Sequence, residues 1–224
     1  MTGTIRELGS RTLSRLHRPL GRWRLRRDLA RVGQPLRIEL GAWTTRRPGW
    51  VPTDVHWRCR NYLDASRTWP VATDSVTCIF SDNVIEHLDM AANRALFREA
   101  LRVLQPGGRM RIVTPDVGAL VQTYLSGPEA AAPLRDELLV EEYGIFHQVD
   151  ILRFAFQDDG HHMGYLWDIT SLTAELQAAG FINVVSRPTG ESDDPDLQGL
   201  ELRVDTPVAH VMLIVEAVKP THER

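Results

Sequence analysis

Apolar residues follow two different periods along the chain. Short runs rich in β-branched and aromatic residues predict strands over 36–40, 50–55, 75–81, 109–115, 182–188 and 208–219. Apolar residues at helical spacing predict helices over 90–104 and 169–181, with further helical pieces within 116–168. Strands that alternate with helices predict an α/β fold, in which a parallel sheet has helices on both faces. The last two strands have no helix between them, so we expect them to pair antiparallel.

Turn and capping residues mark the limits of the two clearest helices. The run QPGG (105–108) should end the first helix, and Gly180 should end the second. Thr170 or Ser171 is expected to cap the start of the second helix. The irregular stretch 117–168 therefore reads as a helical cap inserted into the α/β domain.

Charge divides the chain into two parts. Residues 1–40 hold ten arginines against three acidic residues, a net charge of +7, whereas the remainder carries −10. Leucines and Trp23 recur among these arginines, which predicts a basic helical extension over 1–34, ahead of a domain over 35–220. We favour a helix that packs one face on the domain. A weak contact with a membrane surface or a protein partner is the alternative.

Composition places the chain among soluble globular proteins of one domain. Its 224 residues are 43% hydrophobic and 25% charged, and no stretch is apolar and long enough to span a bilayer. Arginines interrupt the N-terminus, so it does not resemble a secretory signal. Cys59 and Cys78 lack a CxxC spacing and are expected to be small core residues. These features predict a reducing, cytoplasmic location.

Candidate ligand-binding residues follow the predicted strands. In an open α/β sheet, ligands bind at the carboxyl ends of the strands. Gly41 follows the first strand, where a missing Cβ lets backbone approach a ligand closely. Asp54 ends the second strand and could accept both hydroxyls of a ribose, while Asp64 could accept from an exocyclic amine. The segment SDNVIEHL (81–88) ends the next strand and should open toward the same cleft.

Four motifs resemble those of the class I S-adenosylmethionine-dependent methyltransferases, within them the small bacterial type 11-like group. They are IELGA…PGWVPTDV, DSVTCIFSDNVIEHL, FREALRVLQPGGRMRIVTPD and LTAELQAAGF, and the resemblance spans about residues 36–218. It implies a Rossmann-like, doubly wound sheet of seven strands with the last strand antiparallel, and S-adenosyl-L-methionine as cofactor. It also implies that the cofactor contacts Glu39, Gly41, Asp54, Asp64, Ser81, Asp82 and Asn83.

Trp43 departs from the family pattern. The glycine loop of this family usually reads E-x-G-x-G, and Trp43 occupies the place of the second glycine. The indole could fill the cofactor cleft, turn outward, or lie along the ligand, where an aromatic face suits a cationic sulfonium. We expect the last of these, or a place in the pocket wall. The loop of eight residues, 42–49, also leaves little room for a helix after the first strand.

Histidines of the predicted cap are the candidates for acceptor chemistry. An alcohol acceptor needs a base, and histidine can take a proton near neutral pH. We predict His162 as the base and His147 as a second catalytic candidate, with His161 and Tyr165 nearby. For His87 we favour a structural role, as a buried imidazole that ties strand to helix.

Other classes of site are not supported by the sequence. Residues 158–162 and the acidic loop 191–196 carry metal-ligand types, but neither has the spacing of a zinc site or an EF-hand, so no metal is predicted. No GxSxG elbow or P-loop is present. The acidic body argues against a nucleic-acid partner.

The sequence as a whole favours one function over two alternatives. We expect methyl transfer from S-adenosylmethionine to a hydroxyl of a small molecule or glycan. The first alternative keeps the fold but performs methyl-free chemistry, such as cyclisation or elimination, and Trp43 is the feature that supports it. The second is a non-catalytic binding partner, which the arginine-rich extension supports.

Overall fold

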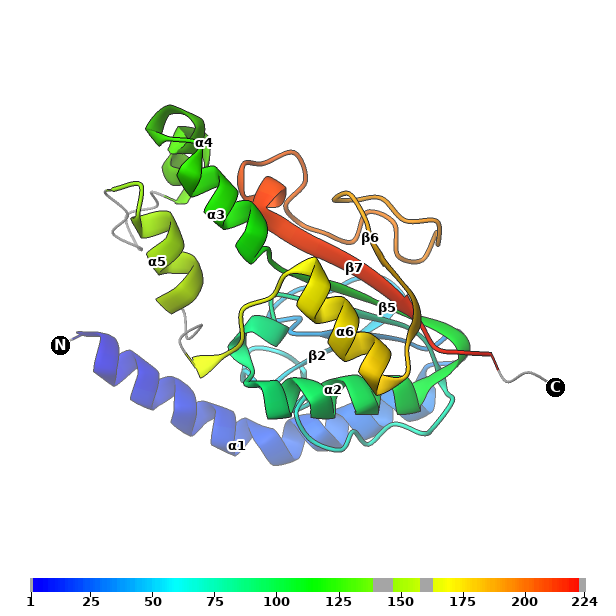
Figure 1. Ribbon diagram of the computed structural model, residues 1–224. Helices are drawn as coiled ribbons and strands as arrows, with labels where there is room; N and C mark the ends of the chain where they lie inside the picture. Colours follow the sequence, from blue (N-terminus) through cyan, green and yellow to red (C-terminus); the bar gives the residue numbers. More distant parts are fainter. Residues whose placement is uncertain (1, 139–146, 158–162, 222–224) are drawn as a thin grey trace.

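A computed structural model describes residues 2–138, 147–157 and 163–221 (Figure 1). Its centre is a seven-stranded sheet of order β3-β2-β1-β4-β5-β7-β6, in which β7 runs antiparallel to both neighbours. The strands are β1 Arg37–Leu40, β2 Trp50–Asp54, β3 Asn61–Tyr62, β4 Val76–Asp82, β5 Leu104–Pro115, β6 Ile182–Ser186 and β7 Met212–Val218. The predicted α/β sheet with an antiparallel last strand is therefore confirmed.

Within the described residues, six α-helices accompany the sheet. They are α1 Thr2–Arg31, α2 Met90–Val103, α3 Val117–Leu125, α4 Pro128–Leu138, α5 Asp150–Gln157 and α6 Ile169–Ala179. Residues 41–49 contain no helix, so β1 passes to β2 through a loop alone, as the short spacing predicts. In Figure 1, α2 and α6 lie along one face of the sheet, whereas α3, α4 and α5 gather beyond it.

Three predicted boundaries need correction. Strand β5 already begins at Leu104, so the QPGG run lies inside the strand, and α2 ends just before it. The cap of α6 is Asp168, whose carboxylate accepts the backbone N–H of Ser171 in a capping box. The last strand was expected to start at residue 208 but starts only at Met212, because residues Val208–Val211 form a 3₁₀ helix. Gly180 ends α6 in the left-handed conformation (φ 109°), as predicted.

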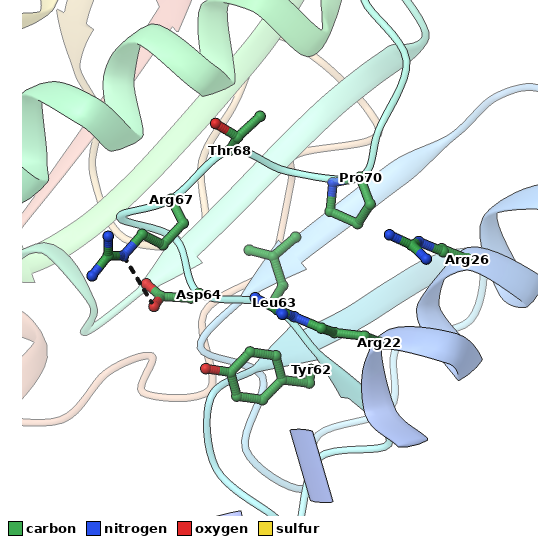
Figure 2. Close-up of a pocket in the computed structure, with 8 residues that line it drawn as sticks. All are labelled: Arg22, Arg26, Tyr62, Leu63, Asp64, Arg67, Thr68 and Pro70. Atoms are coloured by element: carbon green, nitrogen blue, oxygen red, sulfur yellow. Dashed lines mark ion pairs between the residues drawn. The ribbon is translucent and has the colours of Figure 1, made fainter. Parts of the chain in front are cut away.

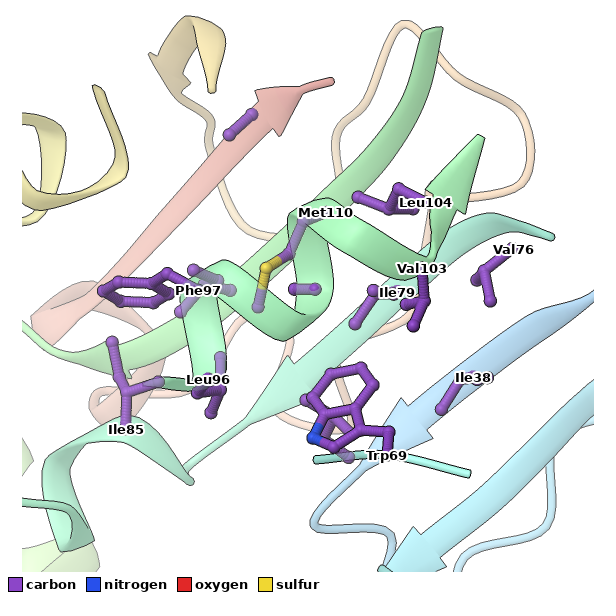
Figure 3. Close-up of a cluster of buried hydrophobic side chains, with 14 of the residues drawn as sticks. Ile38, Trp69, Val76, Ile79, Ile85, Leu96, Phe97, Val103, Leu104 and Met110 are labelled. Carbon is purple, nitrogen blue, oxygen red and sulfur yellow. The ribbon is translucent and has the colours of Figure 1, made fainter. Parts of the chain in front are cut away.

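Apolar side chains bury one face of the sheet, which we call the helical face. Ile79 of β4 and Met110 and Ile112 of β5 pack there against Phe97 of α2 and Leu172 of α6, all at most 1% exposed (Figure 3). Their spacing follows the alternation of side chains along a strand, since the residues between them point to the other face. Burial of this kind contributes about 1.5–3 kcal/mol per large side chain, so this face supplies most of the apolar core.

The prediction of helices on both faces needs correction, because the opposite face is covered by a loop, and we call it the loop face. Phe80 of β4, Val113 of β5 and Ile214 of β7 pack there against Leu197 and Leu200, which belong to the connection between β6 and β7. This connection has the acidic sequence that resembled a calcium loop by charge alone. It occupies the face that a helix between β1 and β2 would otherwise help to cover.

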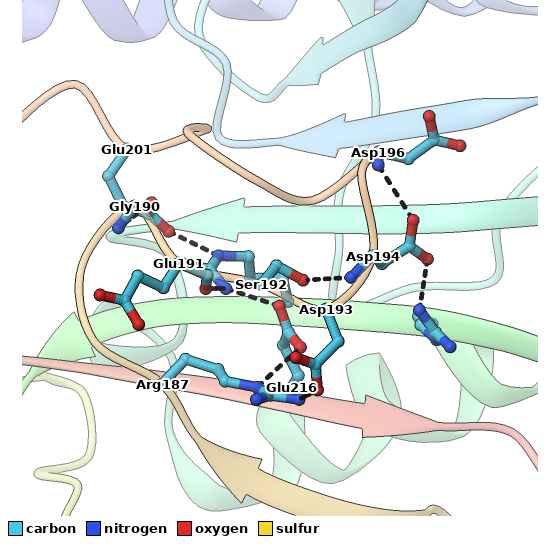
Figure 4. A network of polar contacts seen from close by, with 11 residues as sticks. Arg187, Gly190, Glu191, Ser192, Asp193, Asp194, Asp196, Glu201 and Glu216 are labelled. Carbon is cyan, nitrogen blue, oxygen red and sulfur yellow. Dashed lines mark hydrogen bonds and ion pairs between the residues drawn. The ribbon is translucent and has the colours of Figure 1, made fainter.

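Arginines of the sheet neutralise the acids of that loop. Arg111 of β5, which is fully buried, contacts Glu201 of the loop and Glu216 of β7, each at 2.6 Å. Asp194 pairs with Arg109 at 2.7 Å (Figure 4). The acids are thus tied to the sheet by ion pairs. Among the described residues, no group of three or more His, Cys, Asp or Glu side chains is placed to hold a metal ion.

Helix α1 packs against the sheet edge at β3. Leu25 is fully buried in the core of the helical face, and Asp28 pairs with Arg60 at 2.8 Å. Cys59 and Cys78 are both buried, and burial raises their pKa to about 11 and about 12. Within the described part of the chain, no helix combines the length and the apolar character needed to cross a membrane.

Candidate functional site

A cavity of about 660 Å³ opens at the carboxyl ends of β1, β2 and β4. This volume is within the usual range for a small-molecule site. Six of the eight residues predicted to lie against the cofactor line this one cavity, namely Gly41, Trp43, Asp54, Asp64, Asp82 and Asn83. They come from four separate segments at the ends of β1, β2, β3 and β4, so the sheet brings them together and sequence proximity does not.

Gly41 makes the turn that closes the cavity floor. Its φ of +68° is left-handed, and a Cβ at this position would lie 2.3 Å from Cγ2 of Val84. Glycine alone avoids this collision. The β1 loop therefore lies directly against the end of β4, and the backbone of Gly41 faces the cavity.

Trp43 keeps a glycine-like backbone and turns its side chain outward. Its φ is 45°, and 47% of the residue is exposed. The indole stacks on the ring of His56, with centroids 4.2 Å apart and planes at 15°. The guanidinium of Arg58 lies 5.7 Å from the indole centroid. Trp43 thus forms part of the rim of the cavity and does not fill it.

Asp54 is held in one orientation by two backbone donors. The N–H groups of Trp43 and His56 donate to its two carboxylate oxygens at 2.9 and 2.8 Å. Each carboxylate oxygen can accept a second hydrogen bond, so two acceptor positions remain for a ligand. A fixed pair of acceptors at the end of the second strand suits a vicinal diol such as that of a ribose.

Asp64 lies at the end of the cavity next to β3. Its Oδ1 accepts from the backbone N–H and the hydroxyl of Ser66, at 3.1 and 2.6 Å. Its Oδ2 lies 3.9 Å from Nε of Arg67. Both contacts are local to this loop, and Asp64 still lines the cavity.

Two of the predicted cofactor residues do not line the cavity. Glu39 is 3% exposed, and its Oε1 accepts from Nε of Arg47 at 3.0 Å. Burial raises the pKa of Glu39 against the opposing effect of Arg47. Ser81 is fully buried in β4. Both side chains support the wall from behind, because each sits one position before the strand end.

A polar cluster at the end of β4 combines residues that the sequence did not link. Arg203, from the loop between β6 and β7, lies 3.3 Å from Oδ1 of Asp82, and both line the cavity. With its amide oriented to satisfy both neighbours, Asn83 accepts from Arg203 at 2.9 Å and donates to Glu86 at 3.3 Å. Arg203 carries no local sequence signal, since it is separated from Asp82 by more than a hundred residues.

Glu86 is the most perturbed acid of this cluster. It is 3% exposed and accepts from the hydroxyl of Thr114 at 3.1 Å. Burial raises the pKa of Glu86 to about 8, against the opposing effect of the hydrogen bond from Thr114. A carboxyl group inside the apolar run VIEHL is the sequence signal that could have marked it.

The far end of the cavity has a mixed wall. Pro115, Val208 and Met212 provide apolar surface, while His87 and Glu137 are polar. His87 is half-buried and lines the cavity, so it is not the fully buried imidazole that was expected, and its structural role stays a prediction.

Of the two histidines predicted to be catalytic, His147 belongs to the described residues and His162 does not. His147 is exposed ahead of α5, where its backbone N–H donates to Asp150 at 2.7 Å, and it does not line the cavity. The structure therefore gives no support to a catalytic role for His147. His162 and His161 lie outside the described residues, and the prediction for His162 stays untested.

Comparison with known proteins agrees with this geometry. Residues 50–112 match the family model described as a methyltransferase domain. A search of curated proteins finds no match.

Several solved structures are similar at low identity. A methyltransferase in complex with the Haloferax volcanii Trm112 activator is 15% identical, with 91% of each chain covered and a TM-score of 0.49. A Thermotoga maritima S-adenosylmethionine-dependent methyltransferase is 13% identical, with 93% of this chain and 92% of that chain covered and a TM-score of 0.49. Haemonchus contortus phosphoethanolamine N-methyltransferase 2 is 15% identical, with 89% and 53% covered and a TM-score of 0.49. The chain spans about half the length of some matched structures, 47% for a citrinin polyketide synthase domain.

The family match covers β2 to β5, the part of the chain that contributes Asp54, Asp64 and Asn83 to the cavity. The strand order 3-2-1-4-5-7-6 with β7 antiparallel extends the same fold over the rest of the sheet. The chain therefore carries a class I S-adenosylmethionine-dependent methyltransferase domain, and its cofactor is S-adenosyl-L-methionine.

Proposed function

We propose that the domain methylates a hydroxyl group of a small molecule or glycan. The observation that carries the proposal is the set of residues that line one cavity. Asp54 and Asp64 come from β2 and the loop after β3, on one side of the strand order, whereas Pro115 and Met212 come from β5 and β7 on the other side, with His87 after β4 between them. One volume thus offers room for an adenosine-bearing cofactor and for an acceptor beyond it. The domain's cytoplasmic location stays a prediction from the cysteines.

The residues present fit the cofactor. Asp54 would offer its two remaining acceptor positions to the ribose hydroxyls, and Asp64, which lines the same cavity, would accept from the adenine amine. The backbone around Gly41 and Asn83 can approach the methionine portion, since both residues line the cavity in left-handed conformations. When bound, S-adenosylmethionine supplies an electrophilic methyl group on a sulfonium, whose carbon–sulfur bond breaks as the acceptor oxygen takes the methyl.

The protein has two tasks in such a transfer. It must align the acceptor oxygen with the methyl carbon, and it must take the hydroxyl proton. Among the described histidines, His87 is the one that lines the cavity, so its imidazole is our candidate for the base. His162 remains a second candidate from the sequence.

The cofactor half is tested by titration of the folded protein with S-adenosylmethionine. Asp54→Ala removes charge-assisted hydrogen bonds of about 1.5–3 kcal/mol, so the dissociation constant should rise roughly 10- to 100-fold. Asp193→Ala is the matched control, because Asp193 is exposed and pairs with Arg187 away from the cavity. Equal affinity in the two variants contradicts the role of Asp54. Absence of binding to the native chain promotes the methyl-free alternative.

The acceptor half is tested by transfer of a labelled methyl group to matched hydroxyl, amine and carboxyl acceptors, among them sugars. Hydroxyl acceptors should be the ones labelled. His87→Ala should lower kcat by about 10²–10⁴ while leaving cofactor affinity nearly unchanged. Full activity in His87→Ala, together with loss in His162→Ala, moves the base to His162. Labelling of amines alone rejects the hydroxyl acceptor.

A further inference from the structure

A second, smaller cavity lies between α1 and the loop that follows β3. Its volume is about 210 Å³, and Arg22 and Arg26 of α1 line one side. Arg67 lies on the opposite side, and Tyr62, Leu63 and Pro70 contribute an aromatic and apolar floor (Figure 2). Three guanidinium groups from two separate elements thus border one small concave space, whose lining contains a single carboxylate, Asp64.

The two arginines of α1 have no acidic partner in this cavity. Arg22 and Arg26 are one helical turn apart and exposed, and Figure 2 shows their guanidinium groups on the side of Leu63 and Pro70. Neither forms an ion pair within the part of the chain whose side chains are described. Arg67 does face Asp64, but at 3.9 Å and with 74% of its side chain exposed, and such pairs are weak. Positive charge in the cavity is therefore left uncompensated.

Packing of α1 does not require these arginines. The helix docks through the buried Leu25 and through Gly21, where a Cβ would lie 2.7 Å from Cβ of Tyr62. The ion pair of Asp28 with Arg60 adds a polar contact. Arg22 does lie over the Tyr62 ring, 5.5 Å from its centroid, and this contact restrains the guanidinium at the edge of the cavity. A restrained cation loses less freedom when it binds an anion.

We propose that this cavity binds the phosphate group of an anionic ligand. Guanidinium forks match the geometry of phosphate oxygens, and several arginines around one concave space are a usual arrangement for phosphate. The cavity is small, so it suits a single phosphate-bearing headgroup. Leu63 and Asp64 line both cavities, which places this ligand beside the adenosine end of the main site. The ligand is therefore distinct from the methyl acceptor, which the opposite end receives.

Two sources could supply the phosphate. A soluble phosphorylated compound needs only the cavity. The headgroup of an anionic lipid would also use the outward face of α1, where Leu20 is 47% and Trp23 is 55% exposed. Arg27 lies 4.8 Å from the Trp23 ring centroid, so aromatic and basic side chains meet there, as on helices that bind at a lipid interface.

The test uses the full chain in two arms. One arm titrates inorganic phosphate and glycerol 3-phosphate by calorimetry. The other measures co-sedimentation with vesicles of phosphatidylglycerol and phosphatidylcholine, against phosphatidylcholine alone. The double variant Arg22→Ala, Arg26→Ala should weaken binding about tenfold or more. The matched control Arg24→Ala, Arg31→Ala removes the same charge from α1 outside the cavity, and should weaken binding less than about threefold.

Each arm identifies one source. A soluble ligand is supported if the native chain binds the soluble phosphates and only the Arg22→Ala, Arg26→Ala variant loses this binding. A lipid headgroup is supported if the protein binds the phosphatidylglycerol vesicles but not the soluble phosphates. The Arg22→Ala, Arg26→Ala variant should then lose vesicle binding, and the Leu20→Ala, Trp23→Ala variant should weaken it. No binding in either arm overturns the proposal, and so does an equal loss in both arginine variants. Unchanged affinity for S-adenosylmethionine shows that each variant is folded, and it keeps this test separate from that of the methyltransferase site.

Discussion

The two faces of the sheet are buried by different means. The helical face is covered by α2 and α6 with apolar side chains such as Phe97 and Leu172. The loop face buries a small apolar cluster beside an arginine that pairs with Glu201 and Glu216. Apolar burial is non-directional and tolerates variation, whereas buried charges are stable only when each has its partner. The loop face therefore depends more on individual residues.

The same contrast reaches the functional site. The helical face contributes mainly support, whereas the loop that covers the other face delivers Arg203 to the cavity. Arg111 and its two carboxylates anchor this loop on the sheet (Figure 4). The buried ion pairs that hold this loop on the sheet thus also position Arg203 in the site.

The largest effect should come from removal of the central charge of the loop face. Arg111→Met leaves Glu201 buried without a cation and leaves Glu216 with Arg187 as its remaining partner, which should cost about 3–5 kcal/mol of unfolding free energy in urea. The triple variant Arg111→Met, Glu201→Gln, Glu216→Gln should recover most of that loss, because no uncompensated charge remains. If Arg111→Met lowers the free energy of unfolding by less than about 1 kcal/mol, the contrast between the two faces is wrong.

A matched pair of leucines compares the two faces directly. Leu172 of α6 and Leu197 of the loop are both fully buried. Leu172→Ala should cost about 2–5 kcal/mol, because α2 and the sheet, which pack against α6, limit collapse of the new cavity. Leu197→Ala should cost about 2 kcal/mol, since a loop can relax. Amide exchange should rise over 188–207 only in the second variant, and a uniform rise in both would show that the loop unfolds with the core.

Glu86 offers a comparison of buried carboxyl groups. Its side-chain hydrogen-bond partners, Thr114 and Asn83, are neutral, and it has no ion pair in the described structure, unlike Glu216, which faces Arg111. The folded pKa of Glu86, about 8, exceeds the ordinary value of 4.5. The folded state therefore holds the proton more tightly, so stability is full below about pH 4.5 and falls as pH rises to about 8.

Glu86→Gln should remove this dependence. The free energy of unfolding, measured by thermal unfolding across that pH range, should fall less steeply in the variant. The difference from the native chain should be on the order of 1–3 kcal/mol at the alkaline end. Parallel curves for the native chain and the variant would show that Glu86 is ionised in the folded state at neutral pH.

Trp43 should show the smallest effect, because it belongs to neither buried face. Trp43→Gly keeps the N–H that donates to Asp54 and suits the positive φ, while it loses stacking on His56 of about 0.5–1.5 kcal/mol. Affinity for S-adenosylmethionine should change less than about threefold. A large gain in affinity would show that the indole blocks the site in solution.

The sequence alone predicts the order of the elements except for the two-residue strand β3, and its motifs carry the resemblance to the family. Alternating apolar periods determine which segments form strands, and the spacing of Gly41, Asp54 and Asp64 after those strands is local information. The cavity that gathers these three residues follows, because the carboxyl ends of neighbouring parallel strands meet at one edge.

The tertiary structure alone decided the rest. The outward turn of Trp43 depends on its partner His56, and the arrival of Arg203 depends on ion pairs between the loop and β5. Glu39 and Ser81 look like site residues in sequence but lie behind the wall, because alternation along a strand is decided by the sheet around it. Local propensity carries no information about such contacts, since each joins residues far apart in the chain through packing that exists only after folding.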